Sequence, residues 1–159
     1  MKLFKKSVPE ELAVQLENKE RVFAWAIHPG GIIGVTNLAL ISLDHHERVR
    51  IPWELTISGK WDEPILIVTH QEKIAGQVLQ RAWNLAEPGS VPTAVRERIT
   101  TAQVFEQVKE VPDFGKVRFI ARKGPNGIIW DFLTDEKITQ DSQTHIENTL
   151  RDLRQTLGI

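Results

Sequence analysis

Hydrophobic and polar residues alternate without a break between Val49 and Trp61. Every odd-numbered position is apolar or glycine, and every even-numbered position is charged, hydroxylic or proline. Because successive side chains of a β-strand point to opposite faces, this pattern predicts an extended segment with one buried face. At about 3.3 Å per residue it would span about 43 Å, too long for a straight strand in a small domain. We therefore expect bends at Pro52 and at Ser58-Gly59.

The apolar face of this segment carries two of the five tryptophans, Trp53 and Trp61. Aromatic rings on such a face usually belong to a core, so we expect both to be buried. The alternative is an exposed aromatic platform for a ligand. The opposite face, which includes Arg48 and Arg50, has mixed charge and is expected to face solvent.

The period of two extends over residues 21–85 and predicts about seven short strands. Turn-forming residues separate them, for example at 28–31 and 44–47. The first strand places three large side chains on one face: Phe23, Trp25 and Ile27.

Helical patterns flank these strands. Ser7 and Glu10 fit a capping box, which predicts a short amphipathic helix near residues 8–17. Ser90 is placed to cap a second helix that begins near Pro92.

Residues 99–111 fit two patterns. Their apolar spacing is compatible with a helix, whereas valines interleaved with glutamates are compatible with a strand. The β-branched run at 99–101 favours a helix that ends there and a strand from about Ala102.

The segment 115–135 contains two strand patterns around Asn126-Gly127, which favours a hairpin with these two residues as its loop. That register predicts two cross-strand ion pairs: Arg122 with Asp131, and Arg118 with Asp135. A helix follows, with Asp141 or Ser142 as its cap and Gly158 at its end. Its apolar stripe consists of Ile146, Leu150, Leu153 and Leu157.

The order of helix, about seven strands and helix resembles the pleckstrin-homology-like barrel. The resemblance rests on RVFAWA, GIIGVTNLALISL and RVRIPWELTISGKWDEPILIVT, and a strand ending in Thr-Asn also resembles GRAM-like domains. The chain is similar to an uncharacterised family of small bacterial proteins of this kind. The resemblance implies an α+β fold: a strongly curved antiparallel barrel with a capping helix in residues 1–90. A β-β-β-α extension in 91–159 packs onto it, as a second domain or within one.

Such domains bind inositol phospholipids, peptides or partner proteins and do not catalyse reactions. The lipid-binding members use basic residues in the loop between the first two strands. Here that loop, 28–31, has no lysine or arginine, so no headgroup-binding residue is carried over.

Net charge is −1, which gives no general attraction to nucleic acid or to an anionic membrane. The chain has no cysteine, which excludes thiolate chemistry and is typical of a cytoplasmic protein. The N-terminal MKLFKK has basic residues but no apolar stretch of signal-peptide length, and a frayed terminus is expected there rather than a membrane contact. No window approaches the ~18 apolar residues of a transmembrane helix.

Candidate chemistry is sparse. His45 and His46 are adjacent, so their side chains point apart in an extended chain and are expected in a solvated turn rather than a metal site. His28, His70 and His145 are scattered, and structural or surface roles are expected for them. No nucleophile or phosphate-loop motif is present, so we predict no cofactor and no enzyme activity.

The densest basic cluster consists of Lys116, Arg118 and Arg122, which share one strand face. This face could contact an anion or a partner. The alternative is that Asp131 and Asp135 neutralise it across the hairpin.

The leading hypothesis is a non-catalytic interaction domain that binds a protein or peptide at a strand edge or in a groove. A carrier of a small apolar ligand is the alternative, and an enzyme whose site is dispersed in the sequence is a third. Nucleic acid is not expected as a partner, and a homodimer is compatible with exposed sheet edges.

Overall fold

The computed structural model describes residues 7–159, which form two compact units, one ending at Thr101 and the other spanning Ala102–Ile159. The N-terminal MKLFKK lies outside the described residues. The sequence prediction divided the chain at residue 90, whereas nearly all of helix α2 (Val91–Ala102) belongs to the first unit. The reason is packing: a Cβ atom at Gly59 would lie 3.1 Å from both Val95 and Ile99 of α2.

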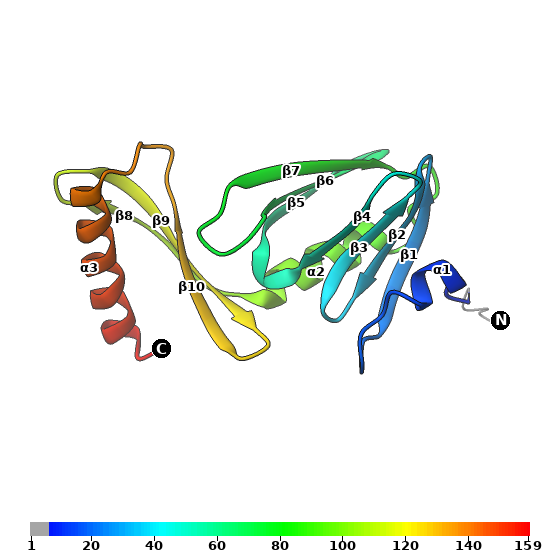
Figure 1. Cartoon of the computed structure of the whole chain (residues 1–159), viewed down its shortest axis with the longest axis horizontal. Coiled ribbons are helices and arrows are strands. Elements are labelled where there is room, and N and C mark those ends of the chain that lie inside the picture. The colour runs from blue at the N-terminus through cyan, green and yellow to red at the C-terminus, as the bar shows by residue number, and fades with distance from the viewer. Residues whose placement is uncertain (1–6) are drawn as a thin grey trace. The chain divides into compact units, whose positions relative to one another are not determined.

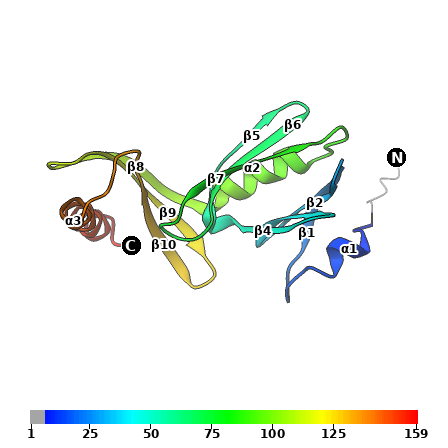
Figure 2. The same ribbon diagram turned by 45° about the horizontal axis from the view of Figure 1, so that its top comes forward.

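The first unit contains two antiparallel sheets (Figures 1 and 2). The four strands of one sheet, in spatial order, are β1 (Val22–His28), β2 (Gly31–Thr36), β3 (Ala39–Asp44) and β4 (Arg48–Pro52). The three strands of the other are β5 (Thr56–Asp62), β6 (Ile65–Gln71) and β7 (Val78–Asn84). The expected seven strands are therefore present, and α2 follows them.

The expected strongly curved pleckstrin-homology-like barrel is wrong. Within the first unit no strand of one sheet pairs with a strand of the other, and both sheets remain open. The cause lies in the alternating segment, which is interrupted by one turn of 3-10 helix, η1 (Trp53–Leu55). The chain bends at Pro52 as predicted, but the bend sends β4 and β5 into different sheets. A second irregularity lies between Thr56 and Ser58.

Two tryptophans form part of the core between the sheets of this unit. Trp53 is 4% exposed and its indole N–H donates to the Thr36 carbonyl at 2.8 Å. Trp83 is 8% exposed and donates to the Ser42 hydroxyl at 2.9 Å, which joins β7 to β3. The expectation of burial is confirmed for Trp53, whereas Trp61 is half-buried.

Strand β1 buries its small side chains rather than its large ones. Ala24 and Ala26 are buried, whereas Phe23 and Ile27 are exposed. A register shift separates Val22 from Ala24. The guanidinium groups of two arginines cover the Phe23 ring: Arg21 at 5.8 Å and Arg98 at 4.9 Å from its centroid.

Helix α1 (Glu10–Ala13) is a single turn, shorter than the predicted helix. Pro9 occupies the N-cap position and no side chain caps the helix, so the predicted Ser7 capping box does not form. Leu12 is nevertheless fully buried over β2, where a Cβ atom at Gly34 would lie 2.7 Å from its side chain. One leucine therefore anchors α1 to the sheet.

The second unit has three antiparallel strands and one helix, in the predicted order. The strands β8 (Gln103–Val111), β9 (Gly115–Gly124) and β10 (Gly127–Leu133) lie in the order β10-β9-β8. The start of β8 confirms the predicted change from helix to strand near Ala102. The core of this unit contains Val111, Val117, Phe119, Ile146 and Leu153.

Helix α3 (Gln140–Leu157) supplies two residues of that core. Its cap is Thr139, not Asp141 or Ser142, because Thr139 and Ser142 exchange the two hydrogen bonds of a capping box. Gly158 ends the helix in the left-handed conformation, as predicted. Among residues 7–159, no helix has the length and apolar character needed to cross a membrane.

We predict that Leu12→Ala lowers the free energy of unfolding by about 2–5 kcal/mol, because it removes a buried side chain and leaves a cavity over Gly34. The control is Val14→Ala, which truncates an apolar side chain that is 66% exposed and should change stability by less than about 0.5 kcal/mol. Urea denaturation measures both. Equal effects of the two substitutions would contradict the anchoring role of Leu12.

Candidate functional site

The predicted register of the β9–β10 hairpin is wrong by two residues. Gly124 pairs with Gly127, so Pro125 and Asn126 form the loop, and Arg122 lies opposite Ile129. Proline is favoured at the second position of a type I turn and glycine at the fourth. These preferences match the observed turn better than one in which Asn126-Gly127 forms the loop.

The basic cluster on β9 is largely neutralised. Arg122 still pairs with Asp131, at 3.2 Å, because a shift by two residues keeps both side chains on one face. Both side chains are only 1% exposed. Arg118 pairs with Glu106 of β8 instead of Asp135, and Lys116 is exposed. This arrangement favours neutralisation over anion contact.

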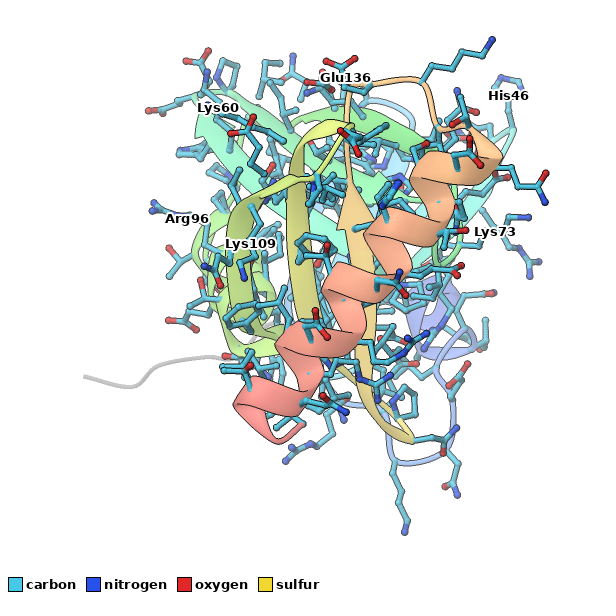
Figure 3. The ribbon with its side chains drawn as sticks, turned by 90° about the vertical axis from the view of Figure 1, so that its left-hand side faces the viewer. His46, Lys60, Lys73, Arg96, Lys109 and Glu136 are labelled. Atoms are coloured by element: carbon cyan, nitrogen blue, oxygen red, sulfur yellow. The ribbon has the colours of Figure 1, made fainter. Side chains whose placement is uncertain are left out.

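The turn at 44–47 organises the adjacent histidines without bringing them together as ligands. Asp44 Oδ1 accepts the backbone N–H groups of His46 (2.7 Å) and Glu47 (2.8 Å), which lowers the pKa of Asp44. His45 and His46 are exposed there, and Figure 3 labels His46. No group of three metal-ligating side chains occurs in the described part of the chain.

A pocket of about 200 Å³ in the first unit lies beside β4. Residues 47–51 and Leu55 line one side, and residues 70–72 with Leu79 and Arg81 line the other. We call it the β4 pocket. It lies between the edge of one sheet and the β6–β7 part of the other, so residues from distant segments meet in it.

The edge of β4 that does not face β3 is open, because β4 is the last strand of its sheet. Backbone N–H groups of Trp53 and Asp44 donate to the carbonyls of Leu38 (3.3 Å) and Glu47 (3.0 Å). Hydrogen bonding alternates along an antiparallel strand, so the odd-numbered residues bond to β3. The even-numbered Arg48 and Arg50 turn their backbone groups away from it. The backbone nitrogen of Pro52 also points away from β3. Its missing N–H therefore removes no hydrogen bond between β3 and β4.

His70 is one of the residues that line this pocket. Its side chain is buried, and Nδ1 lies 3.0 Å from the Gln71 carbonyl oxygen. A carbonyl only accepts, so Nδ1 carries a hydrogen. Nε2 is buried and has no hydrogen-bond partner among the described residues.

Two arginines bring unpaired donors. Arg81 Nη1 lies 3.3 Å from Glu47, but Arg81 Nε is buried without a partner. Arg48 Nη1 donates to the neutral amide of Gln15 at 3.2 Å, and within residues 7–159 no carboxylate forms an ion pair with it. Guanidinium groups cannot deprotonate in proteins, so both positive charges persist.

Arg50, by contrast, pairs with two carboxylates, Glu20 and, at 3.5 Å, Glu17. Its Nη1 and Nη2 donate to the two Glu20 oxygens at 3.0 and 2.9 Å, and the Thr36 hydroxyl also donates to this carboxylate. Burial raises the pKa of Glu20, but the hydrogen bonds from Arg50, Thr36 and the Glu17 N–H outweigh it and hold that pKa below its ordinary value. This ion pair holds β4 to the chain segment before β1.

No pattern in the sequence identifies this site. The alternation predicts that Arg48 and Arg50 face solvent, and a structural or surface role is predicted for His70. The available signal was Pro52 at the end of an arginine-bearing strand, which is typical of a sheet edge. Nothing in the sequence connects that edge with His70 or Arg81.

We predict that Asp131→Ala lowers the free energy of unfolding by about 3–5 kcal/mol, because it removes the carboxylate that pairs with the buried Arg122 guanidinium. The control is Asp135→Ala, which removes an exposed carboxylate and should cost less than about 0.5 kcal/mol. Chemical denaturation at neutral pH measures both. A small effect at Asp131 would show that the pair is accessible to solvent.

We predict that acid weakens the protein through Glu20. Because its pKa is lower in the folded state, its contribution is complete above the ordinary value of 4.5 and is lost as pH falls through the lower folded value. Glu20→Gln should cost about 2 kcal/mol at pH 7 and reduce the loss of stability between pH 5 and 3. Glu87→Gln is the control, because Glu87 is exposed. Urea denaturation at each pH gives the result, and an unchanged acid response in Glu20→Gln would contradict the assignment.

Comparisons with protein-family models, with curated proteins and with solved structures found no match to the chain. The pleckstrin-homology-like resemblance of the sequence receives no support from them. The functional argument therefore rests on the geometry of the β4 pocket.

Proposed function

We propose that this chain is a non-catalytic interaction module that binds an extended segment of a partner protein along the open edge of β4. The observation that carries the proposal is the coincidence of that edge with a pocket lined by charged and polar side chains from both sheets. Strand edges bind peptides through main-chain hydrogen bonds, and adjacent pockets select side chains.

A peptide segment matches the open edge. Its N–H and carbonyl groups can pair with the outward backbone groups of Arg48 and Arg50. The pocket volume of about 200 Å³ suits one side chain rather than a whole folded ligand. The bulk of the partner segment would lie along β4 and outside the pocket.

The β4 pocket does not favour the apolar-carrier alternative. Its lining includes three arginines, two glutamates and a histidine, and no tryptophan. The indole N–H groups of Trp53 and Trp83 are already paired within the core. Packing and hydrogen bonding within the core therefore account for Trp53 and Trp83.

We predict that panning the full chain against a phage-displayed library of random dodecapeptides selects peptides that shift the NMR amide signals of β4. Arg48→Pro should weaken their binding at least tenfold more than Arg48→Ala does. Both variants lose the guanidinium group, but only the proline also removes an outward backbone N–H. The comparison therefore isolates the strand edge.

A library that yields no binder would contradict the proposal, as would selected peptides that bind both variants equally. Circular dichroism and the NMR signals of β1–β3 confirm that each variant is folded before binding is compared.

A further inference from the structure

Strand β1 has an open edge that its sequence does not protect. It is the first strand in the order β1-β2-β3-β4, so within residues 7–159 only β2 pairs with it (Figure 1). Charged side chains and proline are the usual means by which natural edge strands avoid pairing with another chain. The β1 sequence, VFAWAIH, contains no lysine, arginine, aspartate, glutamate or proline. We propose that β1 pairs with β1 of a second copy of this chain, which gives a symmetric dimer.

The other edge strands of the described part of the chain differ from β1 in this respect. Three open sheets have six edge strands, and those besides β1 are β4, β5, β7, β8 and β10. Each of these five contains at least one charged residue: in that order, Arg48, Lys60, Arg81, Glu106 and Asp131. The absence of charge therefore selects β1 as the edge on which another strand meets least resistance.

Backbone hydrogen bonds alternate along β1, which fixes the residues that face the open edge. His28 and Gly31 flank the two-residue turn between β1 and β2 and pair with each other. In such a hairpin the pair that closes the turn is hydrogen-bonded, so the even-numbered residues of β1 bond to β2. The backbone groups of Trp25 and Ile27 consequently point away from β2. Both residues lie in the regular part of the strand, after the register shift between Val22 and Ala24.

The side chains around Ala26 suit pairing with an identical antiparallel strand. If Trp25 lies opposite Ile27 of the second copy, the two residues exchange backbone hydrogen bonds, and the twofold axis repeats this pair. Ala26 then faces Ala26 of the second copy in a non-hydrogen-bonded pair, where the strands are closest and small side chains fit. An aromatic ring opposite a β-branched side chain is a favourable cross-strand pair. Ile27 is 65% exposed in the single chain, so this pairing would cover it.

The contact predicts a weak dimer that leaves the β4 edge open. A pair of short strands buries less than the roughly 1,200 Å² of total surface at which stable interfaces begin. Association should therefore depend on protein concentration. Because β1 and β4 are opposite edges of one sheet, the dimer neither requires nor blocks the proposed peptide site.

Sedimentation velocity of the full chain between about 10 µM and 1 mM tests the dimer. We expect the sedimentation coefficient to rise with concentration, and Ile27→Lys to weaken association at least tenfold because it places a charge on the paired edge of each copy. The matched control is Val78→Lys. Val78 is an apolar β-branched residue of the edge strand β7, 47% exposed, and its substitution should leave association unchanged.

Amide hydrogen exchange of the unaltered chain at low and high concentration locates the contact. Trp25 and Ile27 should gain protection as the dimer forms, whereas Ala26, whose N–H bonds to β2, should not. A chain that stays monomeric over the whole range would overturn the proposal, as would a dimer that Ile27→Lys weakens no more than Val78→Lys does. Circular dichroism confirms that the variants are folded. If Ile27→Lys does not fold, the exchange result decides, and unchanged protection at Trp25 and Ile27 overturns the proposal.

Discussion

The turn at Trp53–Leu55 is the constraint on which the first unit depends. Trp53 is held there by its indole N–H on the Thr36 carbonyl and by its backbone N–H on the Leu38 carbonyl. This anchoring ends β4 and directs the chain into a second sheet. If β4 continued into β5 as one strand, the two sheets would be one curved surface. Because it stops, β4 keeps an open edge, and the β4 pocket forms beside it.

The alternating pattern predicted strands and buried faces well but could not predict this break. Residues on both sides of η1 keep the same parity, so the pattern looks the same with or without it. The hairpin register shows a related limit. A shift by two residues leaves every side chain on the same face, so the Arg122–Asp131 pair formed although the turn was placed wrongly. Only turn chemistry at Pro125 distinguishes the two registers.

The candidate site could not be predicted because its residues meet only through sheet packing. Arg48 lies in β4 of one sheet and His70 lies in β6 of the other, and neither residue stands out in its local sequence. The predicted helix caps were wrong for a similar reason. The N-cap residues are Pro9 and Thr139, but the local sequence pattern fits neighbouring residues equally well. What these side chains can bind depends on which hydrogen-bond and ion-pair partners they lack in the fold. Tertiary structure sets those partners.

Hydrogen exchange of the β4 amides in the unliganded chain tests the central claim, the open edge, most directly. The account predicts alternating protection: Val49 and Ile51 exchange slowly because they bond to β3, and Arg48 and Arg50 exchange quickly because their N–H groups face away. Uniform slow exchange along β4 would contradict it, since that result requires a strand paired on both sides and leaves no edge for a partner.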